Sequence, residues 1–487
     1  MAFKVLLIQA NSPMDTLIPP NLATISACLK EEGIDVRLFD TTFYRTRDVT
    51  GDDARVETLQ VKETDFSEFG IEYNEGSMIT DFVHRYLLFN PNLIGLSAVS
   101  LTYPHGLRLL KSVRDFGTPT IVGGVHATVC ALEVIKEQCV DYVCVGEGEE
   151  ALVELCKKLE NGEDTTNIRN IWAKKNGKII PNPVRPPIDI NKLPFQDWSI
   201  FEKRRRYKPM GGKIRATMCC ELARFCPMNC WYCTNEFYHK LYKNKNYREK
   251  DIDNFINEVK YLKEKYDVKY LYISAESFLV TKKERFEEFI EKYKKIGLPF
   301  WMETRPESVT DEKIKKLKSV GCESMNIGIE SGDPELRVNL LNRRMTDKQI
   351  IDAVQIIKKH EIRIGANNII GFPTETREQI FKTIELNRKA NPDSIMIHPF
   401  NPYYGTKLYD MCVEKGYIDK NEHGGDYRID YILKQEQMSK KELMGLYRTF
   451  AMYTKFPKDR WNEIKKAESN DAVFEKLSDE YRKEYLV

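Results

Sequence analysis

The chain has 487 residues, which exceeds the size at which one hydrophobic core usually stops growing, so two or three domains are expected. Its 75 basic and 73 acidic residues nearly cancel, and this balance gives no indication of a nucleic-acid-binding protein. No segment approaches the roughly 18 consecutive apolar residues of a membrane-spanning helix, and the N-terminus resembles a strand rather than a signal peptide, so a cytoplasmic protein without a membrane span is expected.

The first third of the chain, to residue 159, alternates short apolar runs with helical stretches. This βαβαβ pattern predicts a parallel sheet, in which ligands bind beyond the carboxyl ends of the strands. A polar, acidic segment over residues 47–75 has no clear period and is expected to be an insertion or a long loop. The strands are expected at residues 5–8, 36–39, 93–97, 120–122 and 142–145.

Residues 160–212 form a connecting region. The pair Asn176-Gly177 predicts a hairpin over residues 175–178, because Asn-Gly is a strong tight-turn signal. Several prolines follow between residues 181 and 194, and these exclude a helix or a central strand. A domain boundary is therefore expected here.

Three cysteines, Cys226, Cys230 and Cys233, follow with the spacing C-x3-C-x2-C. Three thiolates on one loop can bind a [4Fe-4S] cluster, and because the cluster has four irons, one iron stays open for a small molecule. The alternative is a zinc site with His239 as the fourth ligand, although zinc sites more usually pair two separated ligand modules. The other nine of the twelve cysteines have no ligand spacing and are expected to be structural, with Cys220 the strongest exception because it lies near this loop.

Residues 213–408 resume the α/β alternation at the spacing of a partial (β/α)6 barrel. The active site of such a barrel gathers at the carboxyl ends of its strands, and the cysteines fall just after the first strand. Residues 409–487 are predicted to be helical, with aromatic residues that either seal one end of the barrel or cover the substrate. The barrel strands are expected at residues 216–220, 270–274, 300–303, 324–328, 364–370 and 394–398.

The cysteine motif, with Tyr232 before its last cysteine, resembles the signature of the radical S-adenosylmethionine (SAM) superfamily. The resemblance implies that the open iron binds the amino and carboxylate groups of SAM, and that one-electron reduction cleaves SAM to methionine and a 5'-deoxyadenosyl radical. It also implies SAM-contacting residues at later strand ends, each of which could instead have a structural role. These residues are Glu276, Arg305, Glu330, Ser331, Gly371 and Pro373.

The N-terminal segment, residues 1–159, resembles the cobalamin-binding domain that precedes many radical SAM cores. The D-x-H-x-x-G motif that supplies a lower cobalt ligand in other cobalamin proteins is missing, and many radical SAM members also lack it. His126 could contact a corrin or bond to nearby backbone. The resemblance implies cobalamin contacts at Ser97, Thr102, Gly123, Gly124, His126, Gly146 and Glu147.

The sequence thus predicts an α/β fold in which a Rossmann-like cobalamin-binding-type domain precedes a partial (β/α)6 radical SAM barrel and a helical C-terminal region. The domains are expected at residues 1–159, 160–212 (linker), 213–408 and 409–487. The leading hypothesis is a cobalamin-dependent radical SAM methyltransferase acting on an unactivated carbon. The alternatives are a radical SAM cyclase, ring-rearranging or carbon-carbon coupling enzyme, or a corrinoid or iron-sulfur carrier. The expected cofactors are a [4Fe-4S] cluster, SAM and cobalamin, and the expected partners are an unidentified substrate and an electron donor such as flavodoxin or ferredoxin.

Overall fold

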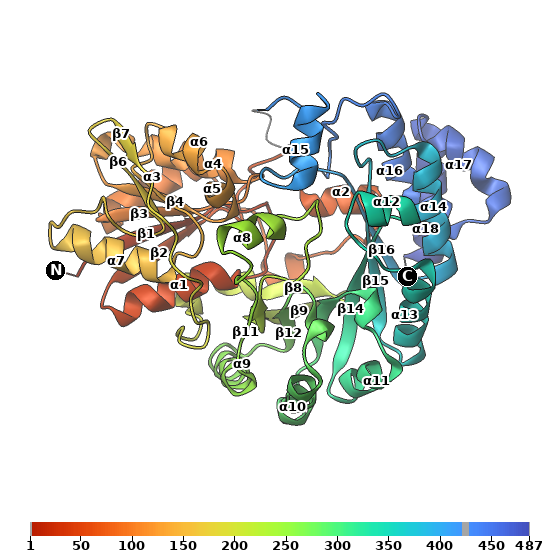
Figure 1. The fold of residues 1–487 in the computed structure, drawn as a ribbon, viewed down its shortest axis with the longest axis horizontal. Helices are drawn as coiled ribbons and strands as arrows, with labels where there is room; N and C mark the ends of the chain where they lie inside the picture. Colours follow the sequence, from red (N-terminus) through yellow and green to blue (C-terminus); the bar gives the residue numbers. More distant parts are fainter. Residues whose placement is uncertain (1, 421–427, 487) are drawn as a thin grey trace.

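The structure, a computed structural model, describes residues 2–420 and 428–486. Two twisted sheets lie side by side, the first built from the N-terminal third of the chain and the second from its centre (Figure 1). Helices surround both sheets, and the C-terminal helices cover the far side of the second sheet. This arrangement confirms the predicted fold class.

The first sheet has the strand order β2-β1-β3-β4-β5-β6-β7. Its first five strands are parallel, and β6 and β7 form the predicted hairpin, which pairs antiparallel to β5. Since this hairpin lies in the connecting region, the domain boundary at residue 159 stays a prediction. The strands are β1 (Lys4–Gln9), β2 (Asp35–Asp40), β3 (Leu93–Ser97), β4 (Thr120–Gly123), β5 (Tyr142–Cys144), β6 (Ile171–Lys175) and β7 (Lys178–Ile180).

Helices on both faces bury the apolar strands of this sheet. Side-chain caps define several of their ends; α3, for example, begins after Ser77, whose hydroxyl accepts a hydrogen bond from the backbone of Thr80. The helices are α1 (Pro20–Glu31), α2 (Gly51–Glu57), α3 (Met78–Phe89), α4 (Tyr103–Ser112), α5 (Val125–Val129), α6 (Ala131–Lys136) and α7 (Glu149–Glu160).

The acidic insertion, residues 47–75, contains α2 rather than only a loop. A capping box between Thr50 and Asp53 starts this helix, and this local signal is independent of any hydrophobic period. Beyond α2, Leu59 is buried in a core formed with the second sheet and the C-terminal helices. The insertion therefore joins the two halves of the molecule.

The second sheet has the order β16-β15-β14-β13-β12-β9-β8, in which all neighbours are parallel except the β8-β9 pair. It is an open half-barrel, as predicted. A small ribbon of β10 (Ala223–Arg224) and β11 (Arg248–Glu249) flanks the cysteine loop. The sheet strands are β8 (Tyr207–Met210), β9 (Lys213–Glu221), β12 (Tyr270–Ser274), β13 (Phe300–Thr304), β14 (Cys322–Glu330), β15 (Arg363–Ile370) and β16 (Ser394–Pro399).

The barrel helices are α8 (Asn235–Leu241), α9 (Ile252–Tyr266), α10 (Lys283–Tyr293), α11 (Asp311–Ser319), α12 (Pro334–Asn339), α13 (Asp347–Lys359), α14 (Arg377–Ala390) and α15 (Lys407–Glu414). Most barrel helices follow the strands in sequence and pack on the outer face, whereas Phe237 and Leu241 of α8 pack against the core of the first sheet. Short 3-10 turns lie at Ser67–Phe69, Arg114–Phe116, Trp198–Ile200, Lys203–Arg206, Phe278–Val280, Pro306–Ser308 and Lys458–Arg460.

The C-terminal region forms α16 (Lys440–Lys455), α17 (Trp461–Ala467) and α18 (Asp471–Tyr485). Its aromatic residues are mostly core residues: Tyr447, Phe450 and Tyr453 are buried in one cluster with side chains of β15, β16 and α14. They are therefore core residues that pack against the β16 edge of the half-barrel, and the two predicted roles, sealing one end of the barrel or covering the substrate, stay predictions.

The cysteines form no disulfide within the parts of the chain that the structure describes. Cys220 is fully buried in the barrel core, which agrees with a structural role. Among the described residues, no helix is both long enough and apolar enough to cross a bilayer.

Candidate functional site

The three predicted cluster ligands lie on one loop between β10 and α8. The side chain of Asn235 organises this loop: its oxygen accepts the backbone N–H of Cys226 at 3.3 Å, and its amide donates to the carbonyls of Cys226 and Met228 at 2.7 and 2.8 Å. The backbone N–H of Asn235 lies 3.5 Å from Cys233 Sγ, and such a bond stabilises a thiolate. Asn235 thus ties the first residues of the loop to the start of α8.

His239, the alternative zinc ligand, also belongs to this scaffold. Its Nε2 lies 3.1 Å from the carbonyl oxygen of Met228 and 2.8 Å from the Asn235 amide. Among the described residues, no three His, Cys, Asp or Glu side chains converge as ligands of one metal ion. A [4Fe-4S] cluster does not need such convergence, because each cysteine binds a different iron.

Two buried arginines approach the central cysteine. Arg305 Nη1 lies 3.5 Å from Cys230 Sγ, and Arg343 Nη1 lies 3.9 Å from the same sulfur. Arg305 also forms an ion pair with Glu307, so the internal salt bridge considered from the sequence is present. Positive charge beside the sulfurs favours bound thiolates over thiols.

Three carboxylates from neighbouring strands lie near one another, and the charge of Glu276 acts on Cys226 and Cys233 of the loop. Glu276 follows β12, Glu303 lies on β13 and Glu330 ends β14. Burial raises the pKa of Glu303 to about 8, and the nearby charges of Glu276 and Glu330 add to the effect. Water can reach Glu276, yet the protein atoms around it desolvate its carboxyl and raise its pKa. A bound cation such as an ammonium group would relieve this crowding of like charges.

Glu330 is held in place by Arg343. The guanidinium lies 3.8 Å from the Glu330 carboxylate, and its Nη1 donates to the hydroxyl of Tyr232 at 3.2 Å. Burial still raises the pKa of Glu330, which has a left-handed φ of 65°. The predicted acidic contact, an aromatic residue of the cysteine motif and the cluster loop are therefore one hydrogen-bonded unit.

The remaining predicted SAM contacts serve mainly to shape loops. Ser331 is fully buried, and its hydroxyl accepts the backbone N–H of Asp333 at 3.2 Å. Gly371 has a φ of 80°, and a Cβ there would come within 2.5 Å of Leu443 and 2.9 Å of Tyr431. The turn at Pro373 is closed by Glu375, whose carboxyl Oε2 accepts the N–H groups of Gly371 and Phe372 at 2.6 and 3.1 Å. Contacts of Ser331, Gly371 and Pro373 with SAM stay predictions.

A cavity of about 610 Å³ opens at the carboxyl edge of the first sheet. Its lining combines Leu7, Gly95 and Ile121 of the sheet with polar and charged residues. This combination suits the tail of cobalamin, an apolar ring joined to a sugar phosphate. Most of the predicted cobalamin contacts line it, namely Ser97, Thr102, Gly123, Gly124, Gly146 and Glu147, and Glu221, Arg224 and Phe225 from the start of the cysteine loop form another part of the wall.

His126 does not line this cavity. Its Nδ1 lies 3.0 Å from the hydroxyl of Ser100, and its ring lies against that of Tyr103 with 4.3 Å between centroids. These contacts correspond to a local structural role, and a contact of His126 with cobalamin stays a prediction.

Glu147 lies at the cavity, but its carboxylate is already engaged. It accepts the backbone N–H of Ile188 at 2.8 Å and pairs with Arg248 and with Arg224, the latter at 3.0 Å. Arg224 also pairs with Glu149 at 2.7 Å and Glu221 at 2.8 Å. An arginine just before the first cluster cysteine thus bridges to the loop after β5, a role that the sequence did not reveal.

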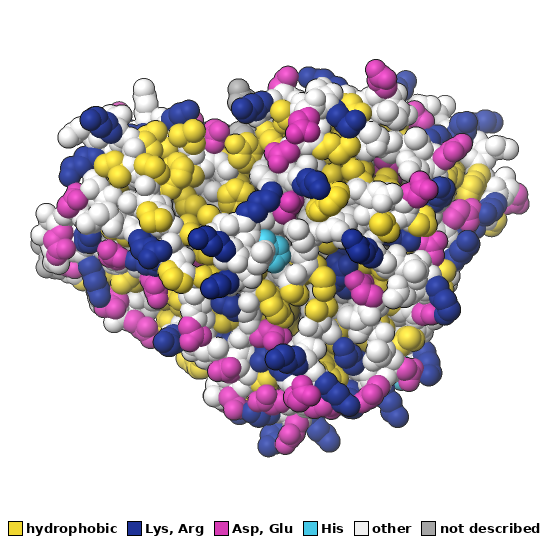
Figure 2. All heavy atoms as spheres, viewed as in Figure 1, with side chains coloured by type: hydrophobic (Ala, Val, Ile, Leu, Met, Phe, Trp, Pro, Cys, Tyr) yellow, Lys and Arg dark blue, Asp and Glu magenta, His cyan; other side chains and the backbone are white. Residues whose placement is uncertain are grey.

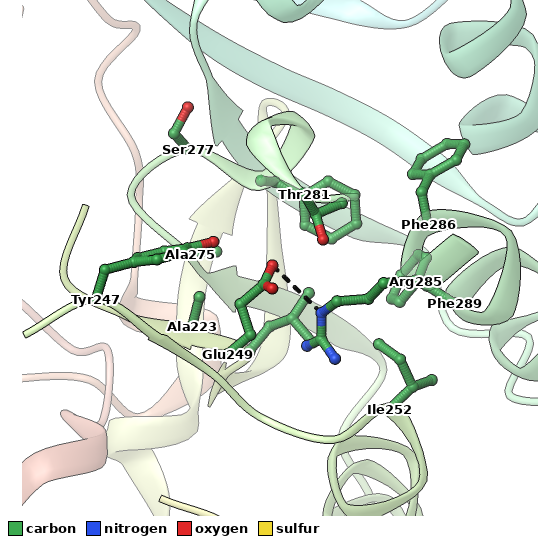
Figure 3. A pocket seen from close by; sticks show the side chains of 12 residues that line it. Ala223, Tyr247, Glu249, Ile252, Ala275, Ser277, Thr281, Arg285, Phe286 and Phe289 are labelled. Atoms are coloured by element: carbon green, nitrogen blue, oxygen red, sulfur yellow. Dashed lines mark ion pairs between the residues drawn. The ribbon is translucent and has the colours of Figure 1, made fainter. Parts of the chain in front are cut away.

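A small crevice lies behind the β10-β11 ribbon (Figure 3). Its volume is about 10 Å³, which is sufficient for about one water molecule. Glu249 and Arg285, which both line it, form an ion pair 3.3 Å apart. The crevice is too small for SAM or a substrate, so the candidate site is the cysteine loop together with the larger cavity.

Comparison with protein families agrees with this geometry. Residues 220–386 match the Radical SAM superfamily, and residues 8–156 match the B12 binding domain. The chain is therefore a radical SAM protein with an N-terminal B12-binding domain. Its cofactors are a [4Fe-4S] cluster, SAM and cobalamin, and the zinc alternative is set aside.

Curated relatives include an uncharacterised methyltransferase of Pyrococcus horikoshii, 27% identical over 366 residues that cover 74% of this chain and 78% of the relative. An anaerobic magnesium-protoporphyrin IX monomethyl ester cyclase of Rubrivivax gelatinosus is 27% identical over 384 residues, 75% of this chain and 67% of that protein. The relatives thus carry more than one reaction name.

Solved structures share the whole fold at low sequence identity. The cobalamin-dependent radical enzyme OxsB with aqua-cobalamin bound has a TM-score of 0.69 at 14% identity, covering 100% of this chain and 76% of that one. The methyltransferase TsrM from Kitasatospora setae, with cobalamin and a [4Fe-4S] cluster bound, has a TM-score of 0.64 at 15% identity, covering 85% and 75%. The order of the two domains and the open barrel are therefore those of known cobalamin-dependent radical SAM folds.

Proposed function

We propose that the protein is a cobalamin-dependent radical SAM methyltransferase that methylates an unactivated carbon. The observation that carries the proposal is the shared wall of the two cofactor sites. Glu221, Arg224 and Phe225 line the cavity of the B12-binding domain and lead directly into Cys226. A reaction that uses both cofactors on one substrate needs this proximity.

When bound, the cluster and SAM supply a radical that removes a hydrogen atom, and cobalamin supplies a methyl group. The protein's own residues position these groups. Cys226, Cys230 and Cys233 would hold the cluster, Arg305 and Arg343 place positive charge beside Cys230, and the carboxylates nearby would bind the SAM ammonium. Ser97, Gly123 and Gly124 would let the cobalamin tail approach the backbone closely.

The test is anaerobic reconstitution with iron, sulfide and cobalamin, followed by SAM and dithionite. Formation of 5'-deoxyadenosine is expected, and Cys230→Ala should abolish it. Cys220→Ala is the matched control, because this thiol is fully buried in the barrel core and should not be needed. If the wild-type protein yields no 5'-deoxyadenosine with any reductant, the proposal fails.

A second candidate, radical cyclisation without net methylation, is favoured by the relative named as a cyclase. The two reactions differ in a product that can be measured before the substrate is known. A methyltransferase should also release S-adenosylhomocysteine when SAM and reduced cobalamin are supplied, whereas a cyclase should release only 5'-deoxyadenosine. With SAM labelled in its methyl group, appearance of the label in cobalamin or in the product would identify methyl transfer.

A further inference from the structure

Basic side chains gather on the outer surface of the cysteine loop. Lys240, Lys243 and Lys245 are exposed on α8 and the turn after it, directly after the last cluster cysteine in sequence. Arg344 is exposed and lines a hollow of about 360 Å³ with Pro227, Met228 and Asn229 of the loop. Figure 2 shows the face around α8, where several dark blue side chains lie near the centre among uncharged atoms and a few magenta ones.

A fifth cation completes this surface. Lys407 is exposed, and its Nζ lies 3.2 Å from the ring centroid of Trp231, a residue of the cysteine loop itself. We define the basic surface as Lys240, Lys243, Lys245, Arg344 and Lys407.

Few of these charges are balanced locally. Glu236 pairs with Lys240 at 3.2 Å, but it is buried, and its other oxygen accepts the backbone N–H of Lys407. Asp410 is exposed, and its negative charge interacts with the positive charge of Lys240. Within the described parts of the chain, no ion pair is formed by Lys243, Lys245 or Arg344. In a chain whose charges otherwise nearly cancel, this surface therefore presents a local positive field.

The ligands of the cluster lie just below the basic surface. Cys226 and Cys233 are only partly buried, and Pro227 and Asn229 between the cysteines are exposed. Electron transfer into a buried centre is fastest where little protein separates it from the donor. The basic surface thus lies where parts of the cluster loop are themselves exposed to solvent.

We propose that the basic surface is the docking site of a small acidic electron carrier with an exposed redox group, of the flavodoxin or ferredoxin kind. The proposal rests on the radical SAM function argued above. One electron passes from the reduced carrier to the cluster, the carrier is oxidised by one electron, and no atom is transferred. Charge attraction would orient the carrier and raise its association rate, which is a common use of such complementary surfaces.

The test compares two reductants on the same reconstituted protein. The triple variant carries Lys243→Glu, Lys245→Glu and Arg344→Glu. Its cluster should be reduced by reduced flavodoxin about 10-fold more slowly or slower still, as measured by the loss of cluster absorbance. Reduction by dithionite, and the 5'-deoxyadenosine it yields, should change less than about twofold. Added salt should slow the flavodoxin reaction of the wild-type protein and have little effect on the variant.

A matched control has the same change of charge elsewhere. Lys178, Lys213 and Lys260 are exposed on β7, β9 and α9, and their exchange for Glu should leave both reductions unchanged. An unaltered flavodoxin rate in the basic-surface variant would overturn the proposal. The proposal would also be overturned if an oligonucleotide bound the wild-type protein but not this variant, while flavodoxin reduced the clusters of both proteins at the same rate. If dithionite yields no 5'-deoxyadenosine from the wild-type protein, the radical function fails instead.

Discussion

The guanidinium of Arg224 lies between carboxylates of both domains, and its partners are largely buried. Replacing it by Gln should leave Glu147, Glu149 and Glu221 without their shared cation. Breaking such a buried pair costs about 3 kcal/mol, so the free energy of unfolding of Arg224→Gln should fall by this amount in urea titrations. Iron loading should fall as well, because the cysteine loop begins beside this residue.

Arg482 provides the control for this prediction. It pairs with Asp479 at 3.3 Å on the surface, and both side chains are largely exposed. Arg482→Gln should therefore cost less than about 1 kcal/mol. If Arg224→Gln is no more destabilising than Arg482→Gln, the bridge does not hold the domains together.

Glu375 predicts a pH dependence. Its carboxyl is fully buried, and this burial raises its pKa to about 8 from an ordinary value near 4.5. The folded protein thus binds the proton more tightly than the unfolded chain, so this contribution to stability is complete below about pH 4.5 and is lost as the pH rises to 8. Relative to Glu375→Gln, the wild-type protein should lose on the order of 2 kcal/mol between about pH 6 and pH 8.

The measurement is urea unfolding of both proteins at a series of pH values. Taking the difference between them cancels the titration of the groups they share. A difference that stays constant with pH would mean that Glu375 is ionised in the folded protein, held so by the N–H groups of Gly371 and Phe372.

At the scale of single residues, the site residues with a regular spacing could be predicted from the sequence, whereas those that act through a partner distant in the chain could not. The cysteines and the acidic strand ends could be predicted because their positions along the chain are regular. Arg343 could not be, because Asn342-Arg343-Arg344 resembles any charged loop, and only the fold turns one arginine toward Cys230 and leaves the next exposed.

At the scale of elements, the docking of the insertion on the half-barrel is the unexpected feature. The side-chain oxygen of Gln60 accepts the backbone N–H of Ile397 at 2.9 Å, on the edge strand β16. Gln60→Leu should leave this buried N–H without its partner and cost about 1 to 3 kcal/mol. Urea unfolding should show the loss, and hydrogen exchange at Ile397 should be faster. Gln138→Leu, at an exposed position, should change neither.

The strands themselves could be predicted closely because each is a short apolar run between polar or glycine-rich turns. Observed ends differ from the predicted ones most at β9, which begins at Lys213 rather than Ala216 because β8 extends the pairing as an antiparallel neighbour. The role of residues 47–75 could not be predicted, since its packing partners are hundreds of residues away. Helix α2 is polar, and burial of Leu59 depends entirely on those partners.

At the scale of the whole molecule, the two cofactor sites share a wall but depend on different loops, so they should be separable. Gly123 lines the cavity, and a Cβ there would meet only Cys144 Cβ at 3.6 Å, an ordinary contact. Gly123→Phe should therefore fold normally, fill the cavity and prevent cobalamin binding. Gly123→Ala is the control and should still purify with a corrinoid spectrum when cobalamin is supplied during expression.

The cysteine loop is untouched by this change, so reconstituted Gly123→Phe should contain its cluster and form 5'-deoxyadenosine within about twofold of the wild-type rate. It should no longer release S-adenosylhomocysteine, because that product requires a methyl acceptor in the cavity. Corrinoid bound by Gly123→Phe at the wild-type level would show that the cofactor lies elsewhere. Loss of both products would show instead that the shared wall couples the two sites, so that filling one distorts the loop that begins at Arg224 and ends at Cys233.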